Sequence, residues 1–170
     1  MLQDRPEPWL TSSDPEQLAI QCLFMRGGSS RGGFFLENEL PIDPIERAAV
    51  LLAIYGSPDG RQIDGIGGAD PLTSKAAVVG RSSQPGADLD YTFYQVSTDR
   101  AKVSTGGNCG NMLAAVAPFG ILRGLIKPQE PETRVRIYTT NTKQVVTVSI
   151  EVAKGFPRVT GKTAVAGVPG

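Results

Sequence analysis

The residues from 112 to 125 restrict the fold of this chain more than any other part of its sequence. They are mostly apolar, and on a helix they would cover nearly every side rather than one stripe. Such a helix is buried on all sides, so the rest of the chain has to surround it. Pro118 lies inside the run and removes one backbone donor, so we expect the helix to bend or split there.

The segments around this helix have the patterns of short strands. Strands are expected at 19–25, 33–36, 76–79, 90–96, 134–139, 144–152 and 158–165. The pair at 134–139 and 144–152 alternates polar and apolar residues on either side of a short polar turn, which predicts a β-hairpin.

One further helix is expected to begin at residues 43–46, to include the apolar run 48–54 and to end at Gly56. Asp43, Pro44 and Glu46 form a typical helix start, and Gly56 is a typical helix end. Many antiparallel strands with two helices predict an α+β domain in which the sheet wraps a buried helix.

The chain is expected to form one domain over residues 19–170, preceded by a flexible N-terminus at 1–18. The start is polar where a signal peptide would be apolar, and no run approaches the ~20 apolar residues that cross a bilayer. We therefore expect a cytoplasmic protein. The two cysteines, Cys22 and Cys109, are far apart and lack a CxxC pattern, so both are expected to be free thiols.

The charge and histidine content exclude several functions. Lys plus Arg equals Asp plus Glu at 17 each and the pI is about 6.3, so no overall field holds a polyanion such as nucleic acid. The chain has no histidine, which excludes serine–histidine and cysteine–histidine hydrolases. A proton carrier near neutral pH must then be a Cys, Lys, Asp, Glu or Tyr.

Two glycine-rich segments, 26–32 and 64–71, offer backbone N–H groups that a small anion could approach closely. Neither has the spacing of a mononucleotide or dinucleotide loop. The Arg-Gly-Gly triplets at Arg26 and Arg31 resemble RNA-binding segments, but those are long and disordered. An anion-binding loop and a purely structural turn both remain open.

Lys75 and Cys109 are the candidate proton carriers. Free cysteines are usually inert core residues, and Cys22 within a strand fits that description. Cys109 follows Asn108, a good N-cap, so its thiol would meet the positive end of a helix, where a thiolate is favoured. Lys75 stands where a loop enters a strand; it is either an exposed lysine or a base desolvated between apolar walls.

Three ordered motifs carry a family resemblance. Residues 22–32 (CLFMRGGSSRG), 67–75 (GGADPLTSK) and 108–111 (NCGN) resemble the 4-oxalomesaconate tautomerase and 2-methylaconitate cis-trans isomerase family. The likeness runs from about residue 21 to the end, where 167–170 resembles a segment from the middle of the family's chains. The chain therefore resembles an N-terminal half, with the second half absent.

The resemblance implies the diaminopimelate epimerase fold, in which two similar halves each wrap an antiparallel, barrel-like sheet around a central helix and enclose the active site in the cleft between them. It implies catalysis by Lys75 and Cys109, and substrate carboxylates held by Arg26, Gly27, Gly28, Ser29, Ser30, Arg31, Thr73, Ser74, Asn108, Gly110 and Asn111. The family usually has Thr in place of Ser29 and Lys in place of Arg31. Self-association or pairing with the second half is also implied.

The implied reaction is a 1,3-proton shift, with movement of the double bond, in an unsaturated tricarboxylate. It needs one base, one acid and positive potential over an enolate, and neither a metal nor an organic cofactor. The sequence of residues 67–75 is more similar to the oxalomesaconate branch of the family, which acts in aromatic-acid breakdown, than to the methylaconitate branch. A non-catalytic carboxylate-binding module is the alternative from another class.

Overall fold

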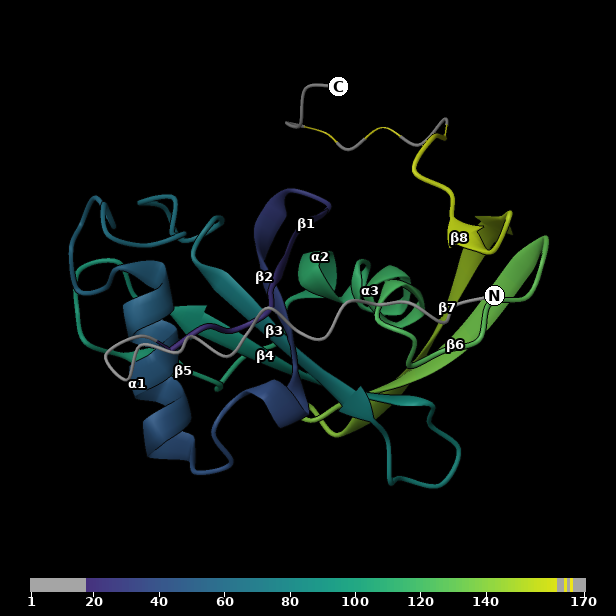
Figure 1. The fold of residues 1–170 in the computed structure, drawn as a ribbon, viewed down its shortest axis with the longest axis horizontal. Coiled ribbons are helices and arrows are strands. Elements are labelled where there is room, and N and C mark those ends of the chain that lie inside the picture. Colours follow the sequence, from purple (N-terminus) through teal and green to yellow (C-terminus); the bar gives the residue numbers. More distant parts are fainter. Residues whose placement is uncertain (1–17, 162–163, 165, 167–170) are drawn as a thin grey trace.

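One curled sheet runs through the molecule, and helices pack on both of its faces (Figure 1). The computed structural model describes residues 18–161, 164 and 166. In chain order the elements are β1 Leu23–Gly27, β2 Ser30–Leu36, the 3-10 helix η1 Glu37–Glu39, α1 Pro44–Tyr55, β3 Lys75–Arg81, β4 Leu89–Val96, β5 Val103–Ser104, α2 Gly110–Leu113, α3 Val116–Leu122, β6 Glu132–Thr139, β7 Gln144–Ala153 and β8 Phe156–Pro157. None of these helices is long and apolar enough to cross a membrane.

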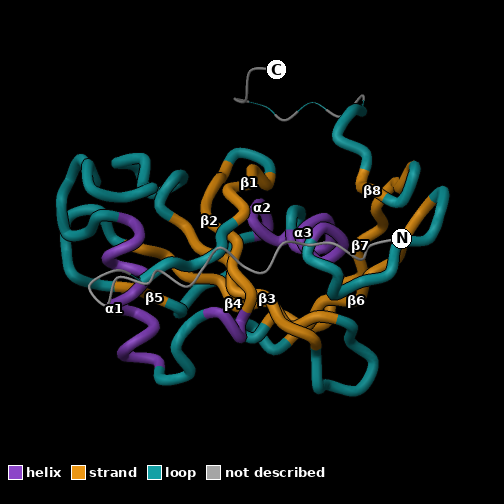
Figure 2. Tube along the Cα trace, viewed as in Figure 1, coloured by secondary structure: helices purple, strands orange, loops and turns teal. Residues whose placement is uncertain are grey.

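The sheet is mixed rather than wholly antiparallel as expected. Its order is β1-β2-β3-β4-β6-β7-β8, with β5 beside β4, and the β2–β3 and β4–β6 pairs are parallel. Parallel neighbours need a long crossover. Here α1 lies in the β2–β3 connection, and α2 and α3 lie in the β4–β6 connection, as the tube in Figure 2 shows. Strand patterns alone do not distinguish such crossovers from hairpins.

Helix α1 confirms the expected start and end. The Asp43 carboxylate caps it by accepting the backbone N–H groups of Ile45 and Glu46, at 2.9 and 3.0 Å. Gly56 ends it with φ +70°, a left-handed conformation that glycine adopts without strain. The helix packs one side on the sheet through Leu51 and Tyr55, which are fully buried.

Strand β3 is buried on both faces, in agreement with its continuous apolar run. Ala76 and Val78 face the cluster that contains α1, whereas Ala77 and Val79 face the cluster that contains α2 and α3. By the same alternation, Lys75 lies on the face of α2 and α3.

The central helix is split, as Pro118 predicts, but the break lies before the proline. The expected helix at 112–125 is instead α2 and α3, separated at Ala114 and Ala115. Proline cannot donate to the carbonyl four residues earlier and crowds it, so the helix breaks there. Pro118 then stands in the first turn of α3, where no donor is required.

The C-terminal part of the sheet is only partly as expected. The β6–β7 hairpin is confirmed, with Glu132 opposite Glu151 and Thr139 opposite Gln144. The strand expected at 158–165 is wrong for 158–161, because the last strand is the short β8 and the chain leaves the sheet after Pro157. The rest of that strand, the terminus expected to be flexible at 1–17, and the motif at 167–170 lie outside the described residues.

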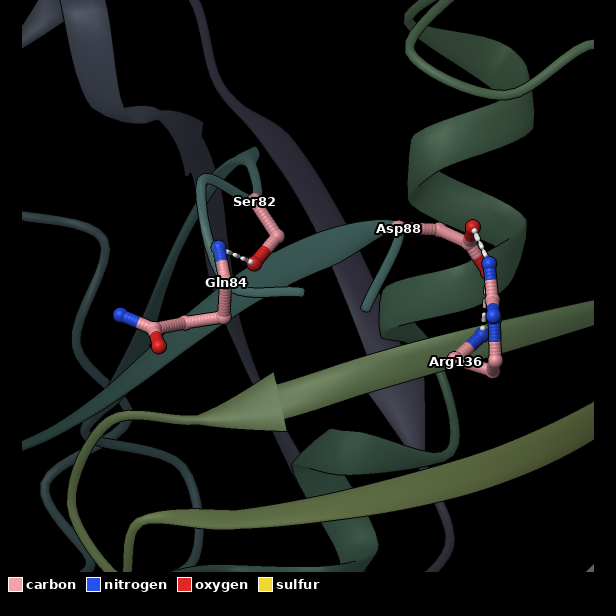
Figure 3. Close-up of polar contacts among 4 residues, drawn as sticks. All are labelled: Ser82, Gln84, Asp88 and Arg136. Atoms are coloured by element: carbon pink, nitrogen blue, oxygen red, sulfur yellow. Dashed lines mark hydrogen bonds and ion pairs between the residues drawn. The ribbon is translucent and has the colours of Figure 1, made fainter. Parts of the chain in front are cut away.

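A bidentate ion pair fixes the parallel β4–β6 contact at its edge. Both carboxylate oxygens of Asp88 accept from the Arg136 guanidinium, at 2.7 and 3.2 Å, and the Arg136 backbone N–H donates to the same carboxylate at 2.8 Å (Figure 3). In the adjoining turn the Ser82 hydroxyl accepts the backbone N–H of Gln84 at 3.1 Å. The hydrogen bonds from Arg136 hold the pKa of Asp88 below its ordinary value.

This pair should give the protein a pH-dependent share of its stability. A carboxyl whose pKa is lowered on folding stabilises the native state above about pH 5, and that share is lost as the pH falls through the native pKa. Asp88→Asn should therefore lower the free energy of unfolding near neutral pH. The loss should be small, because the pair is partly exposed. At about pH 3 the loss should be smaller than at neutral pH, because the wild-type pair then contributes less. Urea unfolding of both proteins at each pH measures the difference. Asp99→Asn, in a more exposed pair, is the control; an Asp88→Asn deficit that does not change with pH would contradict the assignment.

Candidate active site

Lys75 and Cys109 lie side by side, although the strand and the helix that carry them are far apart in the sequence. Lys75 is the first residue of β3, and Cys109 is the N-cap of α2. The Lys75 Nζ is 3.5 Å from the Cys109 Sγ. Both residues are nearly buried, with exposed fractions of 9% and 7%. An amine and a thiol in contact can share and transfer a proton.

Ser30 completes a three-residue cluster. It begins β2, the parallel neighbour of β3, and is fully buried. Its hydroxyl oxygen accepts from the Lys75 Nζ at 3.0 Å and lies 3.8 Å from the Cys109 Sγ. The hydroxyl is thus the third polar group at the junction of β2, β3 and α2.

Two aromatic residues of β4 contact the residues of the cluster. The Lys75 Nζ lies 5.8 Å from the centre of the Phe93 ring, within the range of a cation–π contact. The Tyr91 hydroxyl donates to the Cys109 carbonyl at 3.4 Å, and burial raises the pKa of Tyr91 far above its ordinary value, so the phenol stays protonated. Neither residue was predicted from the sequence, because both occupy ordinary core positions of an alternating strand.

The glycine-rich segment 26–32 is a tight hairpin rather than an open loop. Strands β1 and β2 pair up to Gly27 opposite Ser30, and Gly28 and Ser29 form the turn. Gly28 has φ +67°, which two-residue hairpins require at the first turn position. Gly27 has no room for a Cβ, because the backbone carbonyl of Asn111 lies against it. The hairpin tip therefore packs directly on the start of α2.

The residues at the start of α2 differ in detail from the expectation. Asn108 is not the N-cap: its carboxamide oxygen accepts the Cys109 backbone N–H at 2.9 Å, and Cys109 takes the cap position without a side-chain bond. Asn111 reaches the hairpin turn, where its Nδ2 donates to the Ser29 hydroxyl at 2.9 Å. Asn108, Gly110, Asn111 and Ser29 are all exposed and form the rim above the buried cluster.

The remaining predicted residues are less close to the pair. Ser74 precedes Lys75 but is buried, with its hydroxyl donating to the Gln62 side chain at 2.7 Å. Thr73 donates to the carbonyl of Asp70 at 3.2 Å. The structure brings neither hydroxyl into the Lys75–Cys109–Ser30 cluster.

Arg26 and Arg31 lie directly opposite each other in the hairpin. Alternation along β2 directs Arg31 away from the face of Ser30, and its guanidinium lies 5.5 Å from the Phe24 ring. Among the described residues neither arginine is ion-paired. Like charges in directly opposite positions repel, so an anion between them would be stabilising.

The two cysteines have different surroundings, as expected, although Cys22 lies just before β1 rather than within a strand, because β1 begins at Leu23 and not at residue 19. Cys22 lies in the apolar cluster beside α1, and burial raises its pKa to about 11. Neither cysteine is in a disulfide. Within the part of the chain that the structure describes, no three Cys, Asp or Glu side chains come together as metal ligands.

The half-barrel around split helices defines the class of fold. A hydroxyproline epimerase from Agrobacterium vitis with bound trans-4-hydroxy-L-proline superimposes with a TM-score of 0.55 at 18% identity, over 81% of this chain and 39% of that one. This likeness shows the fold alone, and it confirms the expected epimerase-like architecture. The family follows from the sequence match: the chain belongs to the PrpF protein family, which matches residues 17–170.

Closer relatives are isomerases. The chain is 54% identical over 149 residues to a (4E)-oxalomesaconate Delta-isomerase from Novosphingobium sp. (strain KA1). The matched region covers 88% of this chain and 42% of that protein. It also superimposes on the crystal structure of a methylitaconate-delta-isomerase with a TM-score of 0.87 at 51% identity, over 89% of this chain and 39% of that one. The chain thus spans about two fifths of the length of the relatives it matches.

The geometry predicts that the two thiols differ in reactivity. Near neutral pH iodoacetamide should alkylate Cys109 faster than Cys22, because the Lys75 Nζ lies 3.5 Å from the Cys109 Sγ and can share its proton, whereas burial raises the pKa of the Cys22 thiol to about 11. Lys75→Met should slow alkylation of Cys109 and leave Cys22 unchanged. Peptide mass spectrometry over time measures both rates. Equal rates at Cys109 with and without Lys75 would remove the evidence for an activated thiol.

Proposed function

We propose that the protein containing this chain is a cofactor-independent isomerase that shifts a proton and a double bond within an unsaturated tricarboxylate. The observation that carries the proposal is the buried contact of 3.5 Å between the Lys75 Nζ and the Cys109 Sγ. It supplies an acid and a base at one place in a chain without histidine. The isomerase relatives support the same reaction class.

The reaction divides into two proton transfers. One member of the Lys75–Cys109 pair removes a proton from the carbon next to a conjugated carbonyl or carboxylate, and the electron pair spreads into an extended enolate. The enolate is then protonated two atoms away, which leaves the double bond moved. The Lys75 ammonium and the Ser30 hydroxyl are the donors nearest to the developing negative charge. No external electron carrier is needed.

The rim residues are proposed to hold the substrate carboxylates. Ser29 and Asn111 are exposed and already joined by a hydrogen bond, so both can turn to an incoming carboxylate. Arg26 and Arg31 are proposed to reach the substrate around the edge of the hairpin, because alternation places both on the face of the hairpin opposite to Ser30. We extend the proposal to Gly27, Gly28, Ser30, Thr73, Ser74, Asn108 and Gly110. The Ser30 hydroxyl lies in the cluster, whereas the hydroxyls of Thr73 and Ser74 are bonded to Asp70 and Gln62 and would have to turn to reach a carboxylate.

The proposed substrate is 4-oxalomesaconate. The sequence of residues 67–75 and the similarity to an oxalomesaconate isomerase support this choice. The alternative within the family is cis-trans isomerisation of 2-methylaconitate. A non-catalytic carboxylate-binding domain is the alternative of another class. We further propose that the complete protein is cytoplasmic and that a second half closes the cleft over the cluster.

Substitutions in the complete protein test the reaction and its residues together. Incubation with 4-oxalomesaconate and with 2-methylaconitate, followed by ultraviolet absorbance of the conjugated product, identifies the substrate.

Cys109→Ala and Lys75→Ala should each lower turnover by roughly 10²-fold to 10⁴-fold with the fold intact, the range of a lost acid or base. Cys22→Ala is the matched control and should leave the rate nearly unchanged. Equal losses at Cys22 and Cys109 would contradict the assignment, and a wild type without turnover would favour the binding domain.

The 170-residue chain by itself should have little or no isomerase activity. It spans about two fifths of its relatives, and we propose that the remaining length supplies a second wall of the cleft, which excludes water and completes the carboxylate contacts. Its exposed apolar side chains, among them Phe24 and Phe156, favour self-association. Size-exclusion chromatography and a turnover assay decide this. A monomeric chain with full activity would show that this half is sufficient.

A further inference from the structure

The backbone of Lys75 is held from the face of the sheet opposite to Cys109. The Tyr55 hydroxyl donates to the Lys75 carbonyl and accepts the backbone N–H of Gly33 at 2.8 Å. Tyr55 is the last residue of α1 and is fully buried. Its hydroxyl therefore joins β2 and β3, the strands that carry Ser30 and Lys75, at the level of the cluster.

The protonation state of Tyr55 suits this role. Burial raises the pKa of the phenol far above its ordinary value. The hydroxyl therefore stays protonated near neutral pH and can donate its hydrogen bond. A Phe ring at this position would keep the packing but leave the Gly33 N–H and the Lys75 carbonyl without this partner. Buried backbone groups that lose a partner are costly, so both strands would shift to find another.

Gln62 holds the residue before Lys75. Its side-chain oxygen accepts from the Ser74 hydroxyl at 2.7 Å and from the Ala69 backbone N–H at 2.9 Å, and its Nε2 donates to the Ser57 hydroxyl at 3.0 Å. Both ends of the amide are thus satisfied, and the residue is 1% exposed. The segment 57–74 is folded around this one side chain.

The backbone around Gln62 is shaped to keep the amide in place. Gln62 itself has φ +50°, an uncommon value for a residue other than glycine. Gly67 lies so close to the Gln62 amide that it has no room for a Cβ. Conformations of this cost persist where the surrounding structure fixes them, and they cluster at functional sites.

The opposite side of Ser74 is fixed by β4. The Ser74 carbonyl accepts from the Val96 backbone N–H and from the Gln95 Nε2, each at 3.0 Å. Ser74 and the Lys75 backbone therefore have partners on both sides, while the Lys75 side chain extends to the other face to meet Cys109 and Ser30. A small rotation of this backbone would move the Nζ at the end of its long side chain by much more.

We propose that Tyr55 and Gln62 are positioning residues for the proposed reaction: from the end of α1 and the turn after it, they set the backbone of Ser74 and Lys75 and thereby the distance from the Lys75 Nζ to the Cys109 Sγ. Neither touches the substrate. The inference rests on the proposed function for its effect on turnover, and on the geometry alone for its effect on the thiol.

The test uses the complete polypeptide with the variants Tyr55→Phe and Gln62→Met, and Tyr94→Phe as the matched control. Tyr94 packs against the same cluster as Tyr55, but its hydroxyl accepts from Arg47. Tyr55→Phe and Gln62→Met should lower kcat roughly 10-fold or more with KM changed less than about two-fold, because misplacement of a catalytic group affects the chemical step. Both should also change the rate at which iodoacetamide alkylates Cys109. Tyr94→Phe should change neither quantity.

The two readouts separate the failure of this inference from the failure of the proposed function. If the wild type turns over a tricarboxylate but the folded Tyr55→Phe and Gln62→Met proteins keep wild-type kcat and alkylation rates, the positioning role is wrong and the reaction stands. If the wild type turns over no substrate, the alkylation rates alone decide: a change in the two variants and none in Tyr94→Phe supports the inference, and no change overturns it. Circular dichroism confirms that each variant is folded.

Discussion

The burial of β3 is the constraint on which the rest of the structure depends. It has a hydrogen-bonded strand on each side, and its side chains pack on α1 through Ala76 and Val78 and on the split central helix through Ala77 and Val79. A strand held in this way has almost no freedom to slip, because a one-residue shift would exchange its two faces. Lys75 is placed where this strand begins, so its flexible side chain starts from a backbone with hydrogen-bonded neighbours on both sides.

The chemistry of the Lys75 surroundings is unusual for a buried lysine. Buried charges are normally met by a carboxylate, but the contacts here are a thiol, a hydroxyl and the face of an aromatic ring. A carboxylate would hold the lysine as a permanent ammonium ion. A thiol and an amine can each act as a proton donor or as a proton acceptor, which is what the proposed reaction requires of the Lys75–Cys109 pair.

The sequence predicted those parts of the structure that depend on local pattern. Helix α1 has its cap, its proline and its terminal glycine within its own residues, and the β6–β7 hairpin shows its alternation directly. The parallel pairs were missed because pairing direction depends on crossovers, not on strand composition. Motif resemblance identified Lys75 and Cys109, and their contact is visible only in three dimensions. Phe93, Tyr55 and Gln62 carried no signal, because a buried aromatic in a strand, a tyrosine ending a helix and a glutamine in a turn are ordinary features of a sequence.

The contact between Gly27 and Asn111 links two segments that are distant in the chain. The tip of the β1–β2 hairpin lies against the main chain of α2, and only a residue without a side chain fits between them. The separation of these segments is therefore set by two backbones in contact rather than by side chains that could adapt to one another. If the rim side chains Ser29 and Asn111 hold the substrate as proposed, substitutions at these positions would alter substrate preference while the spacing of the two backbones beneath them stays constant.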